Sequence, residues 1–226
     1  MPIDKKENYY NFVHENPNAP ITKHRLGEFR VFGRGQSEHI KNIGCLHVPQ
    51  WDDKNIADKI DQSADALALY QTTRKDWASV HLYADTDSFI LMLPGDYRCS
   101  GCANPITEQY SIEAEISGFM RYPKEHWLSE TGRKKFVNTA RAYIQLFQLQ
   151  YGKDWKDFAI PAQIGKLQVD GSPEVPGFIQ HRDVPLLSGG KWVQPPDSFK
   201  YGQHEDISPD FPIEYFLKIY EKELLK

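Results

Sequence analysis

The chain has 226 residues, enough for one domain with a sizeable buried core. Its net charge of −4, from 27 basic and 31 acidic residues, gives no electrostatic basis for binding nucleic acid. An aromatic content of 13% excludes a disordered chain, and no apolar run approaches the ~18 residues of a membrane span.

The N-terminal part is polar. It carries the breakers Pro17, Pro20, Gly33 and Gly35, so we interpret residues 1–40 as an extended arm that wraps a domain formed by residues 41–226. The first residues contain no hydrophobic segment, so we expect no secretory signal peptide and synthesis in the cytoplasm. Three cysteines, an odd number, do not make a disulfide framework.

From residue 42 onward, short apolar runs alternate with amphipathic stretches. In order, the pattern predicts a strand ending at His47, a helix over 55–73, a hairpin of 77–85 with 89–93, a strand over 110–116, a helix over 130–151, a strand ending near Ile179 and a helix from 211 to about 224. This order predicts a single α/β domain with a central mixed β-sheet flanked by helices.

Three residues that bind zinc well stand beside breaks in this pattern. His47 and His181 each follow a short buried strand, and Asp206 lies on the loop before the last helix. A catalytic zinc site uses three protein ligands and leaves one position open for water. The competing interpretation is that any one of eight histidines is an ordinary surface or core residue. No His-Glu-x-x-His pair supports a helix-borne metalloprotease site.

The stretches around these residues resemble, in the correct order, those of the type-2 N-acetylmuramoyl-L-alanine amidases. That family includes phage endolysins, bacterial cell-wall amidases and animal peptidoglycan recognition proteins. The resemblance spans roughly residues 42–224 and rests on His47 after its strand, Ser79-Val-His81-Leu-Tyr-Ala-Asp85, Ser111-Ile-Glu-Ala-Glu115-Ile116, Ile179-Gln-His181-Arg-Asp-Val184, and Asp206 before Pro209-Asp-Phe211.

The resemblance implies a zinc enzyme that cuts the amide between the lactyl group of N-acetylmuramic acid and L-alanine. His47, His181 and Asp206 would be the Zn²⁺ ligands, and Glu115 matches the position of the catalytic base. His204 matches a position where several members have a lysine that stabilises the oxyanion. The implied substrate and partner is peptidoglycan.

Two stretches depart from the family pattern, and the identity of the base stays open. Val48 and Pro49 replace the usual small hydroxyl residue after the first ligand, and Asp206-Ile-Ser-Pro209 replaces Asp-Pro-Gly-Pro. Glu113 is the alternative base, because side chains alternate along a strand and it therefore shares a face with Glu115.

Aromatic residues near the expected groove are candidates for stacking on sugar rings. Trp51 and Tyr97 are the first choices, together with Trp127 and Trp192, although such residues are often core. Arg182, next to a predicted ligand, is a further candidate for substrate contact.

Other residues have structural interpretations. We interpret His81 as a buried, hydrogen-bonded histidine. Asp183 either orients His181 or anchors its loop. Cys99 and Cys102 are expected to form a local disulfide, or to be two free thiols at the rim of the cleft.

The leading hypothesis is therefore a zinc amidase of bacterial cell walls, such as a phage endolysin released to the wall by a holin. The alternatives are a cytoplasmic amidase that recycles wall fragments, a module of the same fold that binds peptidoglycan without cutting it, and a metal-free α/β protein.

Overall fold

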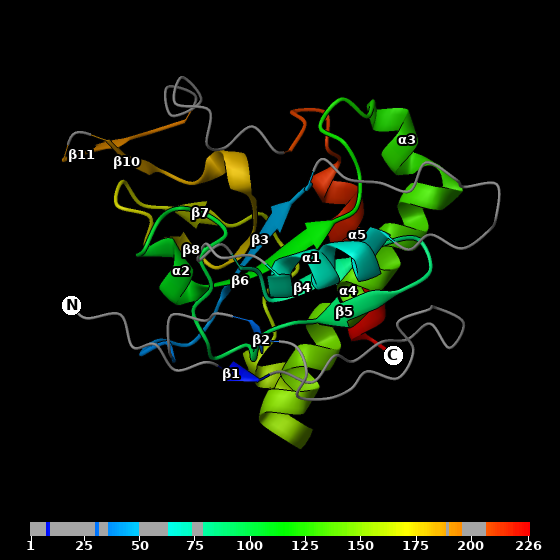
Figure 1. Cartoon of the computed structure of the whole chain (residues 1–226), viewed down its shortest axis with the longest axis horizontal. Helices are drawn as coiled ribbons and strands as arrows, with labels where there is room; N and C mark the ends of the chain where they lie inside the picture. The colour runs from blue at the N-terminus through cyan, green and yellow to red at the C-terminus, as the bar shows by residue number, and fades with distance from the viewer. Residues whose placement is uncertain are drawn as a thin grey trace.

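The computed structural model describes residues 8–9, 30–31, 36–49, 63–73, 79–188, 190–195 and 207–226 (Figure 1). A five-stranded sheet lies at the centre, with the strand order β5-β4-β6-β3-β9. Its strands are β3 (Ile43–His47), β4 (Leu82–Ala84), β5 (Phe89–Leu91), β6 (Ser111–Ile116) and β9 (Gly177–Gln180). β3 is parallel to β6 and β9, β4 is parallel to β6, and only β5 runs antiparallel. The predicted mixed sheet is confirmed.

Five helices accompany the sheet within the described residues. They are α1 (Ser63–Thr73), α2 (Thr107–Tyr110), α3 (Lys124–Leu128), α4 (Glu130–Tyr151) and α5 (Ile213–Leu224). The remaining short elements are β1 (Asn8–Tyr9), β2 (Arg30–Val31), β7 (Lys166–Leu167), β8 (Pro173–Val175), β10 (Leu186–Ser188), β11 (Lys191–Val193) and the 3₁₀ turns η2 (Gly152–Phe158) and η3 (His181–Asp183).

The long helix α4 has the predicted bounds for identifiable reasons. The Ser129 hydroxyl caps its first turn by accepting a hydrogen bond from the Gly132 amide at 3.3 Å. Gly152 ends it with a φ of +57°, a left-handed conformation that glycine adopts without a steric penalty.

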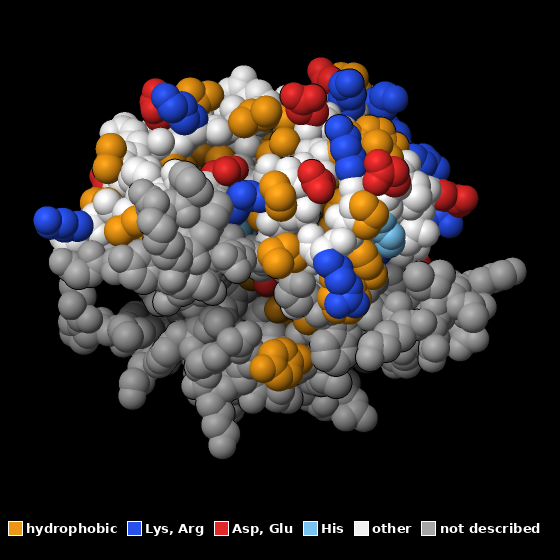
Figure 2. Space-filling model, turned by 90° about the horizontal axis from the view of Figure 1, so that it is seen from above, with side chains coloured by type: hydrophobic (Ala, Val, Ile, Leu, Met, Phe, Trp, Pro, Cys, Tyr) orange, Lys and Arg blue, Asp and Glu red, His pale blue; other side chains and the backbone are white. Residues whose placement is uncertain are grey.

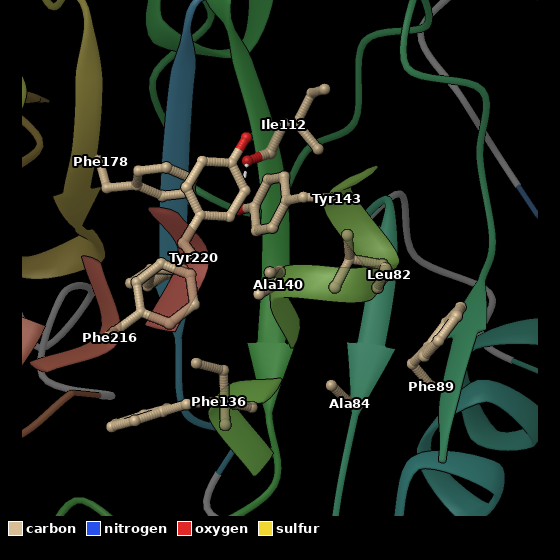
Figure 3. Close-up of a cluster of buried hydrophobic side chains, with 14 of the residues drawn as sticks. Leu82, Ala84, Phe89, Ile112, Phe136, Ala140, Tyr143, Phe178, Phe216 and Tyr220 are labelled. Carbon is tan, nitrogen blue, oxygen red and sulfur yellow. Dashed lines mark hydrogen bonds between the residues drawn. The ribbon is translucent and has the colours of Figure 1, made fainter. Parts of the chain in front are cut away.

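The main hydrophobic core lies between one face of the sheet and the helices α4 and α5. Figure 3 shows the aromatic rings of this layer, with Tyr143 from α4, Phe178 from β9, and Phe216 and Tyr220 from α5 packed together. The Tyr143 hydroxyl donates a hydrogen bond to the carbonyl of Ile112 at 3.0 Å, which satisfies a polar atom that this packing buries. The apolar stripe of α4 is buried throughout: Phe136, Ala140, Tyr143, Ile144 and Phe147.

A second layer covers the opposite face of the sheet. Ala64, Leu67 and Ala68 of α1 pack against Tyr83 of β4 and Ile90 of β5. The sheet is thus flanked by helices on both faces, and its parallel strands are buried on both sides. All five residues of β3 are buried accordingly.

Some expected elements differ in extent. The strand expected over 77–85 is regular only over Leu82–Ala84 within the described residues. The helix expected over 55–73 is described from Ser63, and its expected start lies outside the described residues. Most of the N-terminal arm also lies outside them. The end of the arm contacts the domain, because the Ser37 amide donates to the Asp96 carbonyl at 2.6 Å and its hydroxyl donates to the Gln109 carbonyl.

Basic and acidic side chains are interspersed over the described part of the face in Figure 2, in keeping with the small net charge. Among the described helices, none combines the length and the apolar character that crossing a membrane requires.

Candidate metal centre

The two histidines predicted as metal ligands lie side by side. His47 is the last residue of β3, and His181 directly follows β9. These two strands are neighbours and parallel, so their carboxyl ends lie next to each other at the same end of the strands. The ring centroids of His47 and His181 are 4.3 Å apart, and the ring planes are tilted by 46°. Both side chains are buried, with exposed fractions of 1% and 4%.

A short turn fixes the place of His181. η3 begins with His181 and is held by a reciprocal capping box between Gln180 and Asp183. The Asp183 carboxylate accepts a hydrogen bond from the Gln180 amide at 2.9 Å. Asp183 therefore anchors the turn that presents His181, which is one of its two predicted roles. Arg182 is half-buried in the middle of this turn.

The two glutamates of β6 differ in their burial and in their position relative to His47. Glu115 is the register partner of His47 on the neighbouring strand and is half-buried. Glu113 is fully buried, and its Oε2 atom lies 3.6 Å from Nε2 of His47. Water and substrate can reach a half-buried carboxylate more readily than a fully buried one. The difference in burial therefore favours Glu115 over Glu113 as the base.

The predicted third ligand, Asp206, lies outside the described residues, as do His204 and Trp51. The description resumes at Ile207, which is buried in the main core. Just beyond it, Pro209 and Phe211 line a hollow of about 590 Å³ together with Gln180, the residue before His181. The segment that follows Asp206 thus lies against the strand end that carries the second histidine.

Two neutral imidazoles and a carboxylate would form an ordinary zinc ligand set. Within the described part of the chain, no three His, Cys, Asp or Glu side chains form a group that could hold a metal ion. His47 and His181 fit two of the three ligand positions of a zinc site, and Asp206 would have to supply the third.

His81 is a buried structural histidine, as its sequence context predicts. Its Nδ1 accepts a hydrogen bond from the Glu113 amide at 3.0 Å, and its Nε2 lies 2.8 Å from the Tyr97 carbonyl. A nitrogen that accepts and a nitrogen that donates require the neutral tautomer with its proton on Nε2. Burial, with a smaller contribution from the Lys41 charge, holds the pKa of His81 well below its usual value.

Of the two alternatives for the cysteines, free thiols are confirmed and the disulfide is wrong. The predicted place at a rim is also corrected, because Cys99 and Cys102 are both fully buried. Their loop closes over the carboxylate of Glu113, because a Cβ built on Gly101 would lie 2.1 Å from Oε2 of that residue. Burial raises the pKa of both thiols well above the usual range, and the negative charge of Glu113 adds to this shift.

The aromatic candidates separate into core and surface residues. Trp127 has no exposed surface and packs on Phe136 and Phe211 at centroid distances of 5.8 and 5.1 Å, so it is a core residue and not a sugar platform. Tyr97 and Trp192 are partly exposed and remain candidates for substrate contact.

A buried lysine was missed by sequence reasoning. The Lys41 side chain is 1% exposed, and its Nζ donates to the carbonyls of Glu108 and Ser111 at 2.7 and 2.8 Å. Nothing in its sequence context, at the end of a polar arm, distinguishes it from a surface lysine. The contact between Glu113 and His47 was also missed, although strand alternation did place both glutamates on one face.

The fold is similar to several solved structures at low sequence identity. PlyL is 15% identical with a TM-score of 0.46, and the match covers 82% of this chain and 88% of PlyL. The PlyG catalytic domain is 14% identical with a TM-score of 0.45, covering 83% and 86%. The Staphylococcus aureus hydrolase AmiA, in complex with its ligand, is 19% identical with a TM-score of 0.42, covering 82% and 76%.

No family model matches the sequence, and no curated protein sequence matches it significantly.

Proposed function

We propose that the protein is a zinc-dependent N-acetylmuramoyl-L-alanine amidase, which hydrolyses the amide between the lactyl group of N-acetylmuramic acid and L-alanine in peptidoglycan. The observation that carries the proposal is the pair of buried imidazoles, His47 and His181, with ring centroids 4.3 Å apart at one sheet edge. The order of the sequence motifs that resemble the type-2 amidases supports the same reaction.

His47, His181 and Asp206 would hold the metal ion. A bound Zn²⁺ supplies Lewis-acid catalysis and lowers the pKa of a coordinated water toward ~7. The protein contributes the geometry, because the carboxyl ends of two parallel strands hold the two imidazoles side by side. The turn that is closed by Gln180 and Asp183 fixes the second of them.

Glu115 would act as the general base and acid. As the register partner of His47, it stands at the same sheet edge and is half-buried. Its carboxylate would take a proton from the attacking water and return it to the departing amine of L-alanine. His204, in its protonated form, would stabilise the negative charge that develops on the amide oxygen.

Arg182, Tyr97 and Trp51 are the proposed substrate contacts. Arg182 lies next to His181 and is half-buried. Aromatic rings such as Tyr97 and Trp51 would stack on the apolar faces of the sugars. These contacts would orient a glycan strand so that its stem peptide reaches the metal.

Metal analysis of the purified protein tests the proposal most directly. We expect about one zinc per chain, and little zinc in the His47→Ala, His181→Ala and Asp206→Ala variants, because loss of one of three ligands leaves too few. His39→Ala is the matched control, because His39 is exposed and its ring stacks on Tyr110, which is not a predicted ligand. Zinc binding that survives all three ligand substitutions would contradict the assignment.

Hydrolysis is tested separately by measuring newly formed N-terminal L-alanine from purified peptidoglycan. Release by the parent and not by His181→Ala supports an amidase. Zinc-dependent binding without release would favour a peptidoglycan-binding module instead. A preference for intact cell walls over soluble muropeptides would favour an endolysin, the case in which a holin is the expected partner, over a recycling amidase.

A further inference from the structure

Glu113 is an unusual residue for the interior of a sheet. It lies in the middle of β6 and has no exposed surface, yet it carries a carboxylate. Burying a charged group costs several kcal/mol in effective terms unless partners compensate for the lost water. The compensating groups and the direction in which the carboxylate points therefore indicate what the residue does.

The first carboxylate oxygen is held by the strand itself. Oε1 accepts a hydrogen bond from the hydroxyl of Ser111 at 3.1 Å. The thiol of Cys99 lies close enough that the negative charge of Glu113 adds to the effect of burial in raising the pKa of the thiol. The ammonium of Lys41 supplies the opposite charge nearby. Burial lowers the pKa of Lys41, and surrounding negative groups that include Glu113 counter part of this effect.

The second oxygen is confined between a glycine and a histidine. On one side, Gly101 packs so closely that a Cβ there would lie 2.1 Å from Oε2. On the other side, Oε2 faces Nε2 of His47 at 3.6 Å. This distance is within range for an ion pair and about 0.6–0.7 Å longer than a typical N–H···O hydrogen bond, so the two groups are in electrostatic contact. The carboxylate is therefore fixed by its surroundings with one oxygen directed at the imidazole.

We infer that Glu113 is a positioning residue for His47: its buried carboxylate keeps the imidazole in the tautomer that carries the proton on Nε2 and has its lone pair on Nδ1. The inference rests on the proposed function, because Nδ1 is the atom that would bind zinc through its lone pair. Histidines that bind metal ions commonly donate their other ring N–H to a carboxylate, which fixes both the tautomer and the ring orientation. Glu113 is the carboxylate beside the Nε2 atom of His47. Glu115, the register partner of His47, would instead be the general base.

The tautomer can be measured in the metal-free protein, independently of activity. Long-range ¹H–¹⁵N correlation spectra at mildly alkaline pH should show His47 in the Nε2–H form in the parent. Glu113→Ala should convert it to a mixture of the two tautomers. Glu113→Gln should be intermediate, because its amide oxygen still accepts a hydrogen bond but carries no charge.

Zinc affinity, measured by competition with a chelator, is the second readout. We expect a loss of about 10- to 100-fold in Glu113→Ala and a smaller loss in Glu113→Gln, the usual range for groups that orient a metal ligand. Glu108→Gln is the matched control, because Glu108 is also buried and also close to Lys41. It should leave the tautomer of His47 and the zinc affinity at the parent values.

Two outcomes would overturn the inference. If Glu113→Ala keeps both the tautomer and the zinc affinity, Glu113 is only a buried structural charge. If it abolishes zinc binding as completely as His181→Ala, Glu113 is a ligand itself. A parent protein that binds no zinc would overturn the proposed function, and the tautomer measurement would still decide the role of Glu113.

Discussion

The ring of Phe178 in β9 lies directly against Gly44 in β3. A Cβ built on Gly44 would come within 2.3 Å of Cδ1 of Phe178, so no larger residue fits there without moving the ring. The two residues are register partners, and each precedes the histidine of its strand by three positions. The close contact between Gly44 and Phe178 therefore helps to set the spacing of His47 and His181.

The first prediction concerns Gly44→Ala. The added methyl group should push β3 and β9 apart and lower the free energy of unfolding by about 1–3 kcal/mol, the usual range for overpacking in a core. It should also weaken zinc binding, because the two imidazoles move with their strands. Urea denaturation of the metal-free protein and zinc competition measure the two effects.

A second substitution separates the clash from other effects of alanine. Phe178→Leu makes room beside position 44, so the double variant should be destabilised by less than the sum of the two single variants. Strict additivity would show that the Gly44–Phe178 contact does not set the strand spacing.

The second prediction compares the two glutamates of β6. Glu115→Gln should retain zinc and lower kcat by about 10²- to 10⁴-fold, because an amide cannot take the proton from water. Glu113→Gln should instead act mainly through weaker zinc binding and should recover much of its activity at saturating zinc. Full activity of Glu115→Gln would remove that residue from the mechanism.

The third prediction is an acid-sensitive stability that depends on His81. Its folded pKa is depressed, whereas its unfolded pKa is about 6.5, so the unfolded chain binds more protons below that pH. The free energy of unfolding should therefore fall as the pH drops below about 6.5, by up to about 1.4 kcal/mol per pH unit for this group. Above that pH, the contribution of His81 should be independent of pH.

Urea denaturation of the metal-free protein at several pH values between about 5 and about 7 measures this slope. His81→Gln should reduce the slope, whatever its effect on absolute stability, and His39→Gln should preserve it because His39 is exposed. Equal slopes in the parent and in His81→Gln would contradict the prediction.

The fourth prediction contrasts a buried lysine with a surface lysine. Lys41→Met removes the ammonium beside Glu113 and Glu108, and we expect a loss of about 3–5 kcal/mol because buried carboxylates remain without their counter-charge. Lys134→Met removes an exposed pair with Glu130, which should change the free energy of unfolding by less than about 1 kcal/mol. Similar losses in both variants, measured by urea denaturation, would show that the charge of Lys41 contributes little.

Elements with strong local signals were predictable from the sequence. The helix α4 has a serine cap, a glycine stop and an apolar stripe, so its bounds follow from local residues. The short strands β3 and β9 end where the apolar runs end, which is why the positions of His47 and His181 could be predicted together. Their proximity depends on the strand order, which was not predicted, and the resemblance to the type-2 amidases implied only that both would bind the same zinc ion.

Features that depend on long-range contacts were not predictable. β4 begins later than its apolar pattern indicated, at Leu82. Just before it, the carbonyl of His81 accepts from the Met92 and Leu93 amides, which interrupts the regular pairing. The loop of Cys99 and Cys102 contains small polar residues typical of a surface, yet both cysteines are fully buried and Gly101 packs against the Glu113 carboxylate.

The placement of both imidazoles at the ends of neighbouring strands has a thermodynamic consequence for metal capture. Folding itself gathers donor atoms from distant parts of the chain, so little ordering entropy remains to oppose the arrival of the cation. Binding strength should then depend on how rigidly β3 is held against β9, and substitutions deep in the α4–α5 layer that loosen these strands should weaken it without touching a single ligand. Conversely, the bound ion should stabilise the whole domain, by about 4 kcal/mol when its free concentration is a thousand times its dissociation constant.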